Sequence, residues 1–506
     1  MTNPLSQSET PLLTALWKCA QENHTPFYTP GHKRGVGISQ KLVDAFGKKV
    51  FAADLAELTE LDNLFAPENV IAKAQQLAAE AFGAARTWFL VNGSTCGIEA
   101  AILATCGTGD KIILPRNVHS SAIAGLILSG AIPIFVNPEY DSILDIAHSI
   151  TPESVAAAMQ KHPDAKAILM VYPTYYGVCG DVEAIANIAH SYNIPLLVDE
   201  AHGAHFAFHP ELPISALKAG ADICVQSIHK TLGAMTQASM LHLQGSRVNC
   251  DRITKALQLV QSTSPSYILM ASLDAARSQI ALEGNKLLSH TLHLASTAHQ
   301  RISEIPGLSV LDLNNFNSLN TTQDRTRLTV RVRKLGLTGF AADEILETEF
   351  GIRSEFASSQ HVTFIISLGN TSADIEKLVQ GFIKLAQRYE NNYLFPKHKV
   401  EKSINIFNIE NESLMSPRQA FFAATDTLEV NRICDNNSSI PEAYRILENR
   451  ICAEIICPYP PGIPVLMPGE IITQDAINYL QQILTSGGFI TGCSDTNFQT
   501  VKVVSI

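Results

Sequence analysis

The sequence predicts an α/β fold built on a mostly parallel sheet. Between residues 87 and 243, helix-length stretches separate seven short apolar runs, which are TWFLV, KIILP, AIPIFV, AKAILMVYP, IPLLVDEAH, ADICVQS and ASMLHL. Segments between them, such as SVAAAMQKH and VEAIANIAHSY, place apolar residues three and four positions apart. Continuous apolar strands that alternate with amphipathic helices are typical of a parallel sheet covered on both faces.

Polar clusters follow five of the predicted strands. In chain order they are NGST, PRNVHSS, YPTYYG, DEAHGAH and QSIHK. Open α/β sheets bind their ligands beyond the carboxyl ends of the strands. We therefore expect one functional site to be assembled from these five clusters.

The length of 506 residues predicts two or three domains, since one core rarely serves so long a chain. Residues 1–65 are expected to form an N-terminal arm, and residues 66–305 a large domain that ends in helix-rich sequence. Residues 306–396 show a weaker mixture of strands and helices and predict a small α+β domain. A polar segment near 397–412 then begins a C-terminal domain, 397–506.

Composition narrows the class of partner. The formal net charge is −11 and no basic cluster occurs, which argues against nucleic acid. The N-terminus lacks the pattern of a secretory signal, and the most apolar stretch, 123–136, is interrupted and too short to span a bilayer. Ten cysteines include no CxxC pair, which predicts reduced thiols and a cytoplasmic protein.

Lys230, in QSIHK, is the first candidate for chemistry. A lone lysine after a strand is usually a solvated surface residue. Asp199, however, ends the strand PLLV 31 positions before Lys230. A carboxylate there could bond the pyridine nitrogen of pyridoxal 5′-phosphate and hold it protonated, while a lysine carries the cofactor as a Schiff base. The pair at this spacing therefore indicates a pyridoxal-phosphate site.

Two further clusters suit the same cofactor. Asn92-Gly93-Ser94-Thr95 precedes a helix expected near Cys96, and amide donors with two hydroxyls at a helix N-terminus can hold a phosphate. An ordinary helix cap fits these residues equally well. His119 could stack on the cofactor ring and contact the substrate carboxylate, or it could be a capping or buried structural histidine.

The DEAHGAH segment admits two other interpretations. His202, His205 and His209 lie close together in sequence, but no carboxylate stands at ligand spacing, so we expect no metal. The letters DEAH also spell a helicase motif. That function requires a GxxxxGK[ST] phosphate loop upstream, and the sequence has none.

The ordered motifs YTPGHKRG, LVNGSTCG, PRNVHSS, YPTYYGV, LLVDEAHGAHF, SIHKTLGAMTQAS and PYPPGIPVLMPGE resemble the Orn/Lys/Arg decarboxylase family. The resemblance covers nearly the whole chain and is densest between Pro26 and Asp274. It implies a fold type I enzyme dependent on pyridoxal phosphate, with a seven-stranded sheet domain and smaller α+β domains after it. The match is to the short bacterial form, since long members begin with an extra flavodoxin-like domain.

The resemblance also implies roles for individual residues. Lys230 would bind the cofactor covalently, Asp199 would pair with its ring nitrogen, and His119 would stack on the ring. The phosphate-binding set would be Ser94, Thr95, Ser227 and His229, with His202 beside the ring in a role that the family pattern leaves open. Lys230 and His119 are both candidates for returning a proton to the substrate carbon. The active site would be shared across a homodimer or a higher homo-oligomer.

The implied reaction is decarboxylation of a basic L-amino acid, arginine or lysine before ornithine. A distal ammonium or guanidinium needs an acidic partner. Candidates are Asp54, Glu57, Glu60 and Asp62 in the arm, with Glu454 and Glu470 near the C-terminus, although a solvated surface carboxylate is the ordinary role of each.

Two rivals stay open. An aminotransferase or a β-eliminating lyase would share the lysine, the aspartate and the phosphate site, and an aminotransferase would also use an arginine such as Arg353 or Arg418. The second rival is a homologue that binds the cofactor without turnover.

Overall fold

The structure is a computed structural model that describes residues 6–313, 321–390, 407, 413–430, 450–460 and 462–505. The predicted linker 397–412 therefore lies outside the described residues except for Phe407. The chain divides into two compact units. The first unit consists of Met1–Ala104 and Pro195–His290, and the second consists of Thr105–Ile194 and Thr291–Ile506. The three boundaries expected from the sequence, after residues 65, 305 and 396, stay a prediction.

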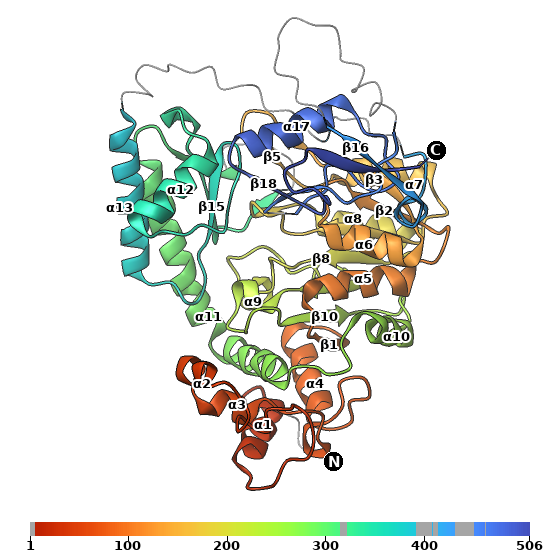
Figure 1. Cartoon of the computed structure of the whole chain (residues 1–506), viewed down its shortest axis with the longest axis vertical. Coiled ribbons are helices and arrows are strands. Elements are labelled where there is room, and N and C mark those ends of the chain that lie inside the picture. Colours follow the sequence, from red (N-terminus) through yellow and green to blue (C-terminus); the bar gives the residue numbers. More distant parts are fainter. Residues whose placement is uncertain are drawn as a thin grey trace, which may run out of the picture. The chain divides into compact units, whose positions relative to one another are not determined.

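All seven predicted strands form one sheet (Figure 1), with the order β1-β10-β9-β8-β6-β2-β3. The strands are β1 (Arg86–Leu90), β2 (Lys111–Pro115), β3 (Ile132–Val136), β6 (Ala167–Val171), β8 (Leu196–Asp199), β9 (Ile223–Gln226) and β10 (Ser239–Leu243). Strand β10 runs antiparallel to both β1 and β9, while β2–β3, β2–β6 and β8–β9 are parallel. The mostly parallel sheet is therefore confirmed, with β10 as the reversed strand.

Helices precede, separate and follow these strands. They are α4 (Val70–Phe82), α5 (Gly93–Thr105), α6 (Ser120–Ser129), α7 (Pro152–Lys161), α8 (Val182–Ser191), α10 (Cys250–Val260) and α11 (Tyr267–Ser303). Helix α5 lies close to the sheet because Gly97 has no side chain. A Cβ at that position would stand 2.7 Å from both Leu90 Cδ1 and Val225 Cγ1. This close packing fixes the helix whose first turn contains Gly93, Ser94 and Thr95.

The N-terminal arm consists of α1 (Pro11–Gln21), α2 (Gln40–Phe46), α3 (Lys48–Ala53) and a 3-10 turn, η1 (Thr59–Leu61). The buried guanidinium of Arg277, in α11, donates to the carbonyl oxygens of Gln7 and Glu9 and to the carboxylate of Asp274. Asp274 in turn accepts from the backbone N–H of Leu12 at 2.9 Å. A buried ion pair that also binds the backbone therefore ties the start of the arm to α11.

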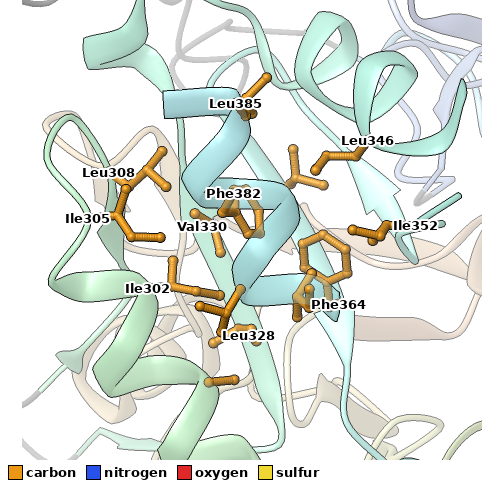
Figure 2. Packing of buried hydrophobic residues seen from close by; sticks show 14 of the residues in the cluster. Ile302, Ile305, Leu308, Leu328, Val330, Leu346, Ile352, Phe364, Phe382 and Leu385 are labelled. Carbon is orange, nitrogen blue, oxygen red and sulfur yellow. The ribbon is translucent and has the colours of Figure 1, made fainter. Parts of the chain in front are cut away.

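The second unit contains a small antiparallel sheet of β11 (Ser309–Val310), β13 (Arg327–Arg331), β15 (His361–Ile365) and β14 (Phe356–Ala357), in that order. Helices α12 (Gly339–Phe350) and α13 (Ser372–Arg388) complete it. Figure 2 shows Phe382 of α13 among Leu328, Val330 and Phe364 of the sheet, in a core that also contains Ile302 of α11. Most residues of this hydrophobic core lie within 306–396, the range of the predicted small domain.

A separate core lies in the C-terminal segment, where Leu466, Ile477, Leu480 and Val503 are buried together. Its elements are α15 (Pro417–Phe421), β16 (Thr425–Glu429) paired with β19 (Thr500–Val504), β17 (Cys457–Tyr459) paired with β18 (Phe489–Thr491), and α17 (Gln474–Thr485). Across the described part of the chain, every helix is too short or too polar to cross a membrane.

Candidate active site

Lys230 lies on a short helix, α9 (Ile228–Thr231), that begins directly after β9. Its backbone N–H bonds the carbonyl of Ser227 at 3.1 Å, which turns the chain sharply at the end of the strand. The half-buried side chain places Nζ 3.0 Å from Nε2 of His202. The lysine is therefore directed by a second polar side chain rather than being a solvated surface charge.

Asp199 ends β8 and is buried, with 9% of its surface exposed. Its Oδ1 accepts the backbone N–H of Ala201 at 3.1 Å. Burial raises the pKa of Asp199, and the nearby positive charge of Lys230 opposes that rise. The carboxylate and the amine predicted to share a cofactor therefore lie close enough to influence each other electrostatically.

The predicted phosphate cradle forms at the first turn of α5. Gly93 has φ = +75°, a left-handed conformation that favours glycine. Ser227 is fully buried, and its Oγ donates to Oγ of Ser94 at 2.8 Å, while Thr95 is exposed beside it. Hydroxyls beside the unpaired N–H groups of a helix N-terminus suit a phosphate.

His229 forms a hydrogen bond with the protein backbone. Its Nδ1 bonds the carbonyl oxygen of Ala238 at 3.0 Å. Because a carbonyl only accepts, Nδ1 carries the proton of that bond. This contact supports the turn between α9 and β10, and a phosphate contact from His229 stays a prediction.

The first unit thus contains a set that fits pyridoxal phosphate. An amine that can bind an aldehyde, a buried carboxylate near it and a helix N-terminus with hydroxyls occupy the carboxyl ends of β9, β8 and β1. These are the three kinds of group that the cofactor requires for its carbonyl carbon, its ring nitrogen and its phosphate.

His119 belongs to the second unit, where it caps α6. Its Nδ1 accepts the backbone N–H of Ser121 at 3.1 Å, so a neutral ring carries its proton on Nε2. Gly462, of PYPPGIP, bonds the N–H of Ser120 through its carbonyl, and a Cβ there would be 3.4 Å from Nε2 of His119. The capping role considered from the sequence is therefore present, and stacking on the cofactor stays a prediction.

The two C-terminal candidates for the substrate's acidic partner are already engaged. Glu470 is 2% exposed and accepts from Arg116 at 3.2 Å and from the N–H of Met467 at 2.9 Å. Glu454 is buried and accepts the N–H groups of Ser494 and Lys502 at 2.7 and 2.8 Å. Both carboxylates therefore have structural partners, and a substrate contact from either stays a prediction.

In the arm, Asp54 pairs with His32 of the PGHK motif at 3.1 Å. Glu57 accepts from the side-chain amide of Asn63 at 2.8 Å, and Glu60 is exposed. Partial desolvation raises the pKa of Glu57 above its ordinary value, although the residue is largely exposed. The structure therefore leaves the acidic partner of the substrate unassigned among the predicted residues.

Asp62 serves as a remote cap for α4. Its carboxylate accepts the N–H groups of Asn63 and Glu68 at 3.0 Å, of Asn69 at 2.7 Å and of Ile71 at 3.1 Å. Burial alone would raise the pKa of Asp62, but these hydrogen bonds outweigh it and hold the pKa below its ordinary value of 3.8.

We expect Asp62→Asn to lower the free energy of unfolding by about 1–2 kcal/mol at pH 7, because an amide NH2 would replace one of the two accepting oxygens and leave backbone N–H groups unsatisfied. Because the folded pKa is lowered, the carboxylate's contribution is present above the unfolded pKa and is lost as the pH falls through the folded one. Urea denaturation should therefore show the two proteins converging below about pH 4. A raised KM with unchanged stability would instead support the predicted substrate role.

The other polar residues examined from the sequence have structural partners. His209 bonds Ser289 Oγ at 2.9 Å, and His205 is buried against Phe206. Arg418 donates to the carbonyl oxygens of Ile127 and Leu128 at the end of α6. Arg353 is highly exposed and pairs with Glu347 at 2.8 Å. Both arginines therefore bind protein partners and not a substrate carboxylate in this structure, which weakens the aminotransferase alternative.

Two buried charged residues were not predicted from the sequence to have a role. Arg116, in PRNVHSS, donates to the carbonyl oxygens of Pro464 and Val465 at 2.7 and 2.9 Å and so joins two of the recognised motifs. Glu200, next to Asp199, is fully buried. A charged residue that directly follows an apolar strand was the available signal for both.

The fold and these residues define a fold type I enzyme of the kind that uses pyridoxal phosphate. The model of the Orn/Lys/Arg decarboxylase major domain matches residues 10–327, and that of the C-terminal domain matches residues 405–492. The chain therefore belongs to the Orn/Lys/Arg decarboxylase family, which is dependent on pyridoxal phosphate, and it is a decarboxylase.

Relatives match over the whole chain. The arginine decarboxylase of Bacillus subtilis (strain 168) is 39% identical over 99% of both chains. That of Bacillus anthracis is 38% identical over 99% of this chain and 98% of its own. The solved structure of lysine decarboxylase A from Pseudomonas aeruginosa has a TM-score of 0.81 at 23% identity and covers 98% of this chain and 80% of its own. The last likeness confirms the predicted fold.

Proposed function

We propose that this chain decarboxylates L-arginine to agmatine and carbon dioxide, with pyridoxal phosphate bound covalently to Lys230. The observation that carries the proposal is the contact of Lys230 with His202 beside the buried carboxylate of Asp199. The arginine decarboxylases at 38–39% identity support arginine over lysine and ornithine.

When bound, the cofactor supplies an electron sink for the pair of electrons left when carbon dioxide departs. Asp199 would hold a proton at the ring nitrogen and so keep that sink positively charged. Lys230 would hold the cofactor through its ε-amine. His202, 3.0 Å from Nζ, orients the lysine and can exchange a proton with it.

A decarboxylation assay of the purified protein on arginine, lysine and ornithine in parallel tests the substrate. We expect kcat/KM for arginine to exceed that for the other two by about tenfold or more, equivalent to about 1.4 kcal/mol of transition-state binding. Release of carbon dioxide and formation of keto acid are measured together. Keto acid without carbon dioxide would establish the aminotransferase alternative.

We also propose a homodimer whose contact includes the N-terminal arm. The arm exposes large apolar side chains, with Phe27 and Val36 about nine-tenths exposed and Phe46 65% exposed. Exposed apolar side chains that gather on one segment of a soluble protein are typical of an interaction surface. The family resemblance, which implies an active site shared between two chains, also supports a homodimer.

In sedimentation equilibrium we expect Val36→Glu/Phe46→Glu to shift the protein from dimer to monomer, because two charges would have to be desolvated at the contact. Leu259→Glu, at a 79% exposed position of α10, is the matched control and should leave the dimer intact. A dimer that persists in the double variant would place the contact elsewhere.

A cytoplasmic location is proposed from the cysteines. The nine that lie in the described residues are all free. Free, mostly buried thiols are the rule in reducing compartments.

A further inference from the structure

Glu200 directly follows Asp199, so the two side chains point to opposite faces of the sheet. Its backbone N–H bonds the carbonyl of Val225 at 2.9 Å, which extends the β8–β9 pairing by one residue. The side chain is completely buried. Asp199 is thus the cofactor-side member of this pair, and Glu200 lies behind it.

Three donors converge on the carboxylate of Glu200. Oε1 accepts the backbone N–H of Ala216 at 2.7 Å. Oε2 accepts the side-chain amide of Gln226 at 2.7 Å and the thiol of Cys224 at 2.9 Å. Burial raises the pKa of Glu200 to about 7 although these bonds oppose the rise. The residue therefore clamps the end of β8 to alternate residues of β9, the strand that leads to Lys230.

A chain of hydrogen bonds, each donated in the same direction, crosses four strands and ends at Glu200. The hydroxyl of Thr87 lies 2.7 Å from Nδ1 of His242, and Nε2 of His242 lies 3.1 Å from Oε1 of Gln226. Since Gln226 uses its amide nitrogen on Glu200, its oxygen accepts, so Nε2 of His242 donates and Nδ1 accepts from Thr87. Burial lowers the pKa of His242 to about 3, which keeps this neutral tautomer.

The turn after Glu200 packs back on its side chain. The N–H of Gly203 bonds the carbonyl of Glu200 at 2.9 Å. A Cβ at Gly203 would stand 2.7 Å from Cγ of Glu200, so only glycine permits this approach. The turn contains His202, the partner of Lys230. Asp199 and His202 are thus attached to the two ends of a segment that Glu200 anchors.

We propose that Glu200 is a positioning residue that, through its contacts with Ala216, Cys224 and Gln226, holds Asp199 and His202 in the orientation that the cofactor and Lys230 require. This proposal rests on the proposed cofactor site. The groups around Glu200 that can titrate are Cys224, in contact with it, His242, one link away, and Asp199, its chain neighbour. Glutamine at position 200 would place an amide donor against one of the three donors.

The test compares Glu200→Gln with Asp222→Asn. Asp222 is equally buried and binds the N–H of Leu196 at 2.9 Å, so it joins the same two strands at their opposite ends. We expect Glu200→Gln to lower kcat about tenfold or more with KM within twofold, and to shift the pH midpoint of the cofactor's visible absorbance. In the apoprotein, hydrogen exchange of residues 199–206 should quicken. Asp222→Asn should lower Tm but leave kcat, the pH midpoint of the absorbance and the hydrogen exchange of residues 199–206 unchanged.

Cys224→Ala provides a milder variant should Glu200→Gln fail to fold, since it removes one of the three donors, and we expect the same shifts at smaller size. A Glu200→Gln or Cys224→Ala protein with lowered Tm but with unchanged kcat, absorbance midpoint and exchange would overturn the proposal. Failure of the proposed function is distinct, because it would appear in the unmodified protein, which would then release no carbon dioxide from arginine before any substitution is made.

Discussion

Lys230→Ala should abolish both the visible absorbance of the bound cofactor and turnover, with kcat lower by about 10³-fold or more, as loss of a covalent catalyst requires. Lys230 is the amine of the set, and its Nζ lies against His202 at 3.0 Å. Without it, the described residues of this set include no amine that could bind an aldehyde. Absorbance after addition of pyridoxal phosphate and carbon dioxide release from arginine measure the two effects.

Lys218→Ala, which alters an exposed lysine of the same unit, is the control and should keep both signals. A retained absorbance band in Lys230→Ala would refute the assignment of this lysine. Absorbance that disappears while turnover persists would refute the cofactor's role. The rival of a binding protein without turnover predicts the band in the unmodified protein and no carbon dioxide from any basic amino acid.

Asp199→Asn should lower kcat by about 10²–10³-fold, the range found when a single preorganised electrostatic contact to the transition state is removed. The amide cannot hold a proton at the ring nitrogen, so the electron sink loses its charge. Asp199 is buried, and its contact with Ala201 preserves the backbone turn in the variant. We therefore expect the cofactor to remain bound while catalysis fails.

Steady-state kinetics on arginine and cofactor titration of the apoprotein separate the two effects. Asp251→Asn, in the exposed first turn of α10, is the control for loss of a negative charge in this unit. A variant with normal kcat would remove Asp199 from the site. Loss of cofactor binding together with kcat would instead assign it an anchoring role.

Much of the fold could be predicted because the pattern of apolar residues within each short stretch of sequence indicates a strand or a helix. The seven apolar runs all became strands, and SVAAAMQKH and VEAIANIAHSY became α7 and α8 within two residues of their expected limits. The reversed direction of β10 was less accessible, because an apolar run states that a strand is buried and not which way it runs. The domain boundaries stay a prediction for a related reason, since contacts between distant segments decide them.

The candidate site divides in the same way. Residues at strand ends were predictable because the carboxyl ends of neighbouring strands share one edge of a sheet, and Lys230, Asp199, His202, Ser94 and Ser227 do lie together. The carboxylates proposed for the substrate were not, because their partners come from elsewhere in the chain. Asp62 caps α4, while Glu470 binds Arg116, 354 residues away in sequence.

The sequence by itself determined the class of fold and the family, and it supplied the residues proposed to hold the cofactor, because periodicity and short motifs are local properties of the chain. Only the tertiary structure decided which polar side chains are committed to protein partners. Glu200 shows the difference. In the sequence it is the second letter of a motif, whereas in the structure three donors from two other segments meet its carboxylate behind Asp199. Convergence of that kind depends on the folded sheet, which no short stretch of sequence contains.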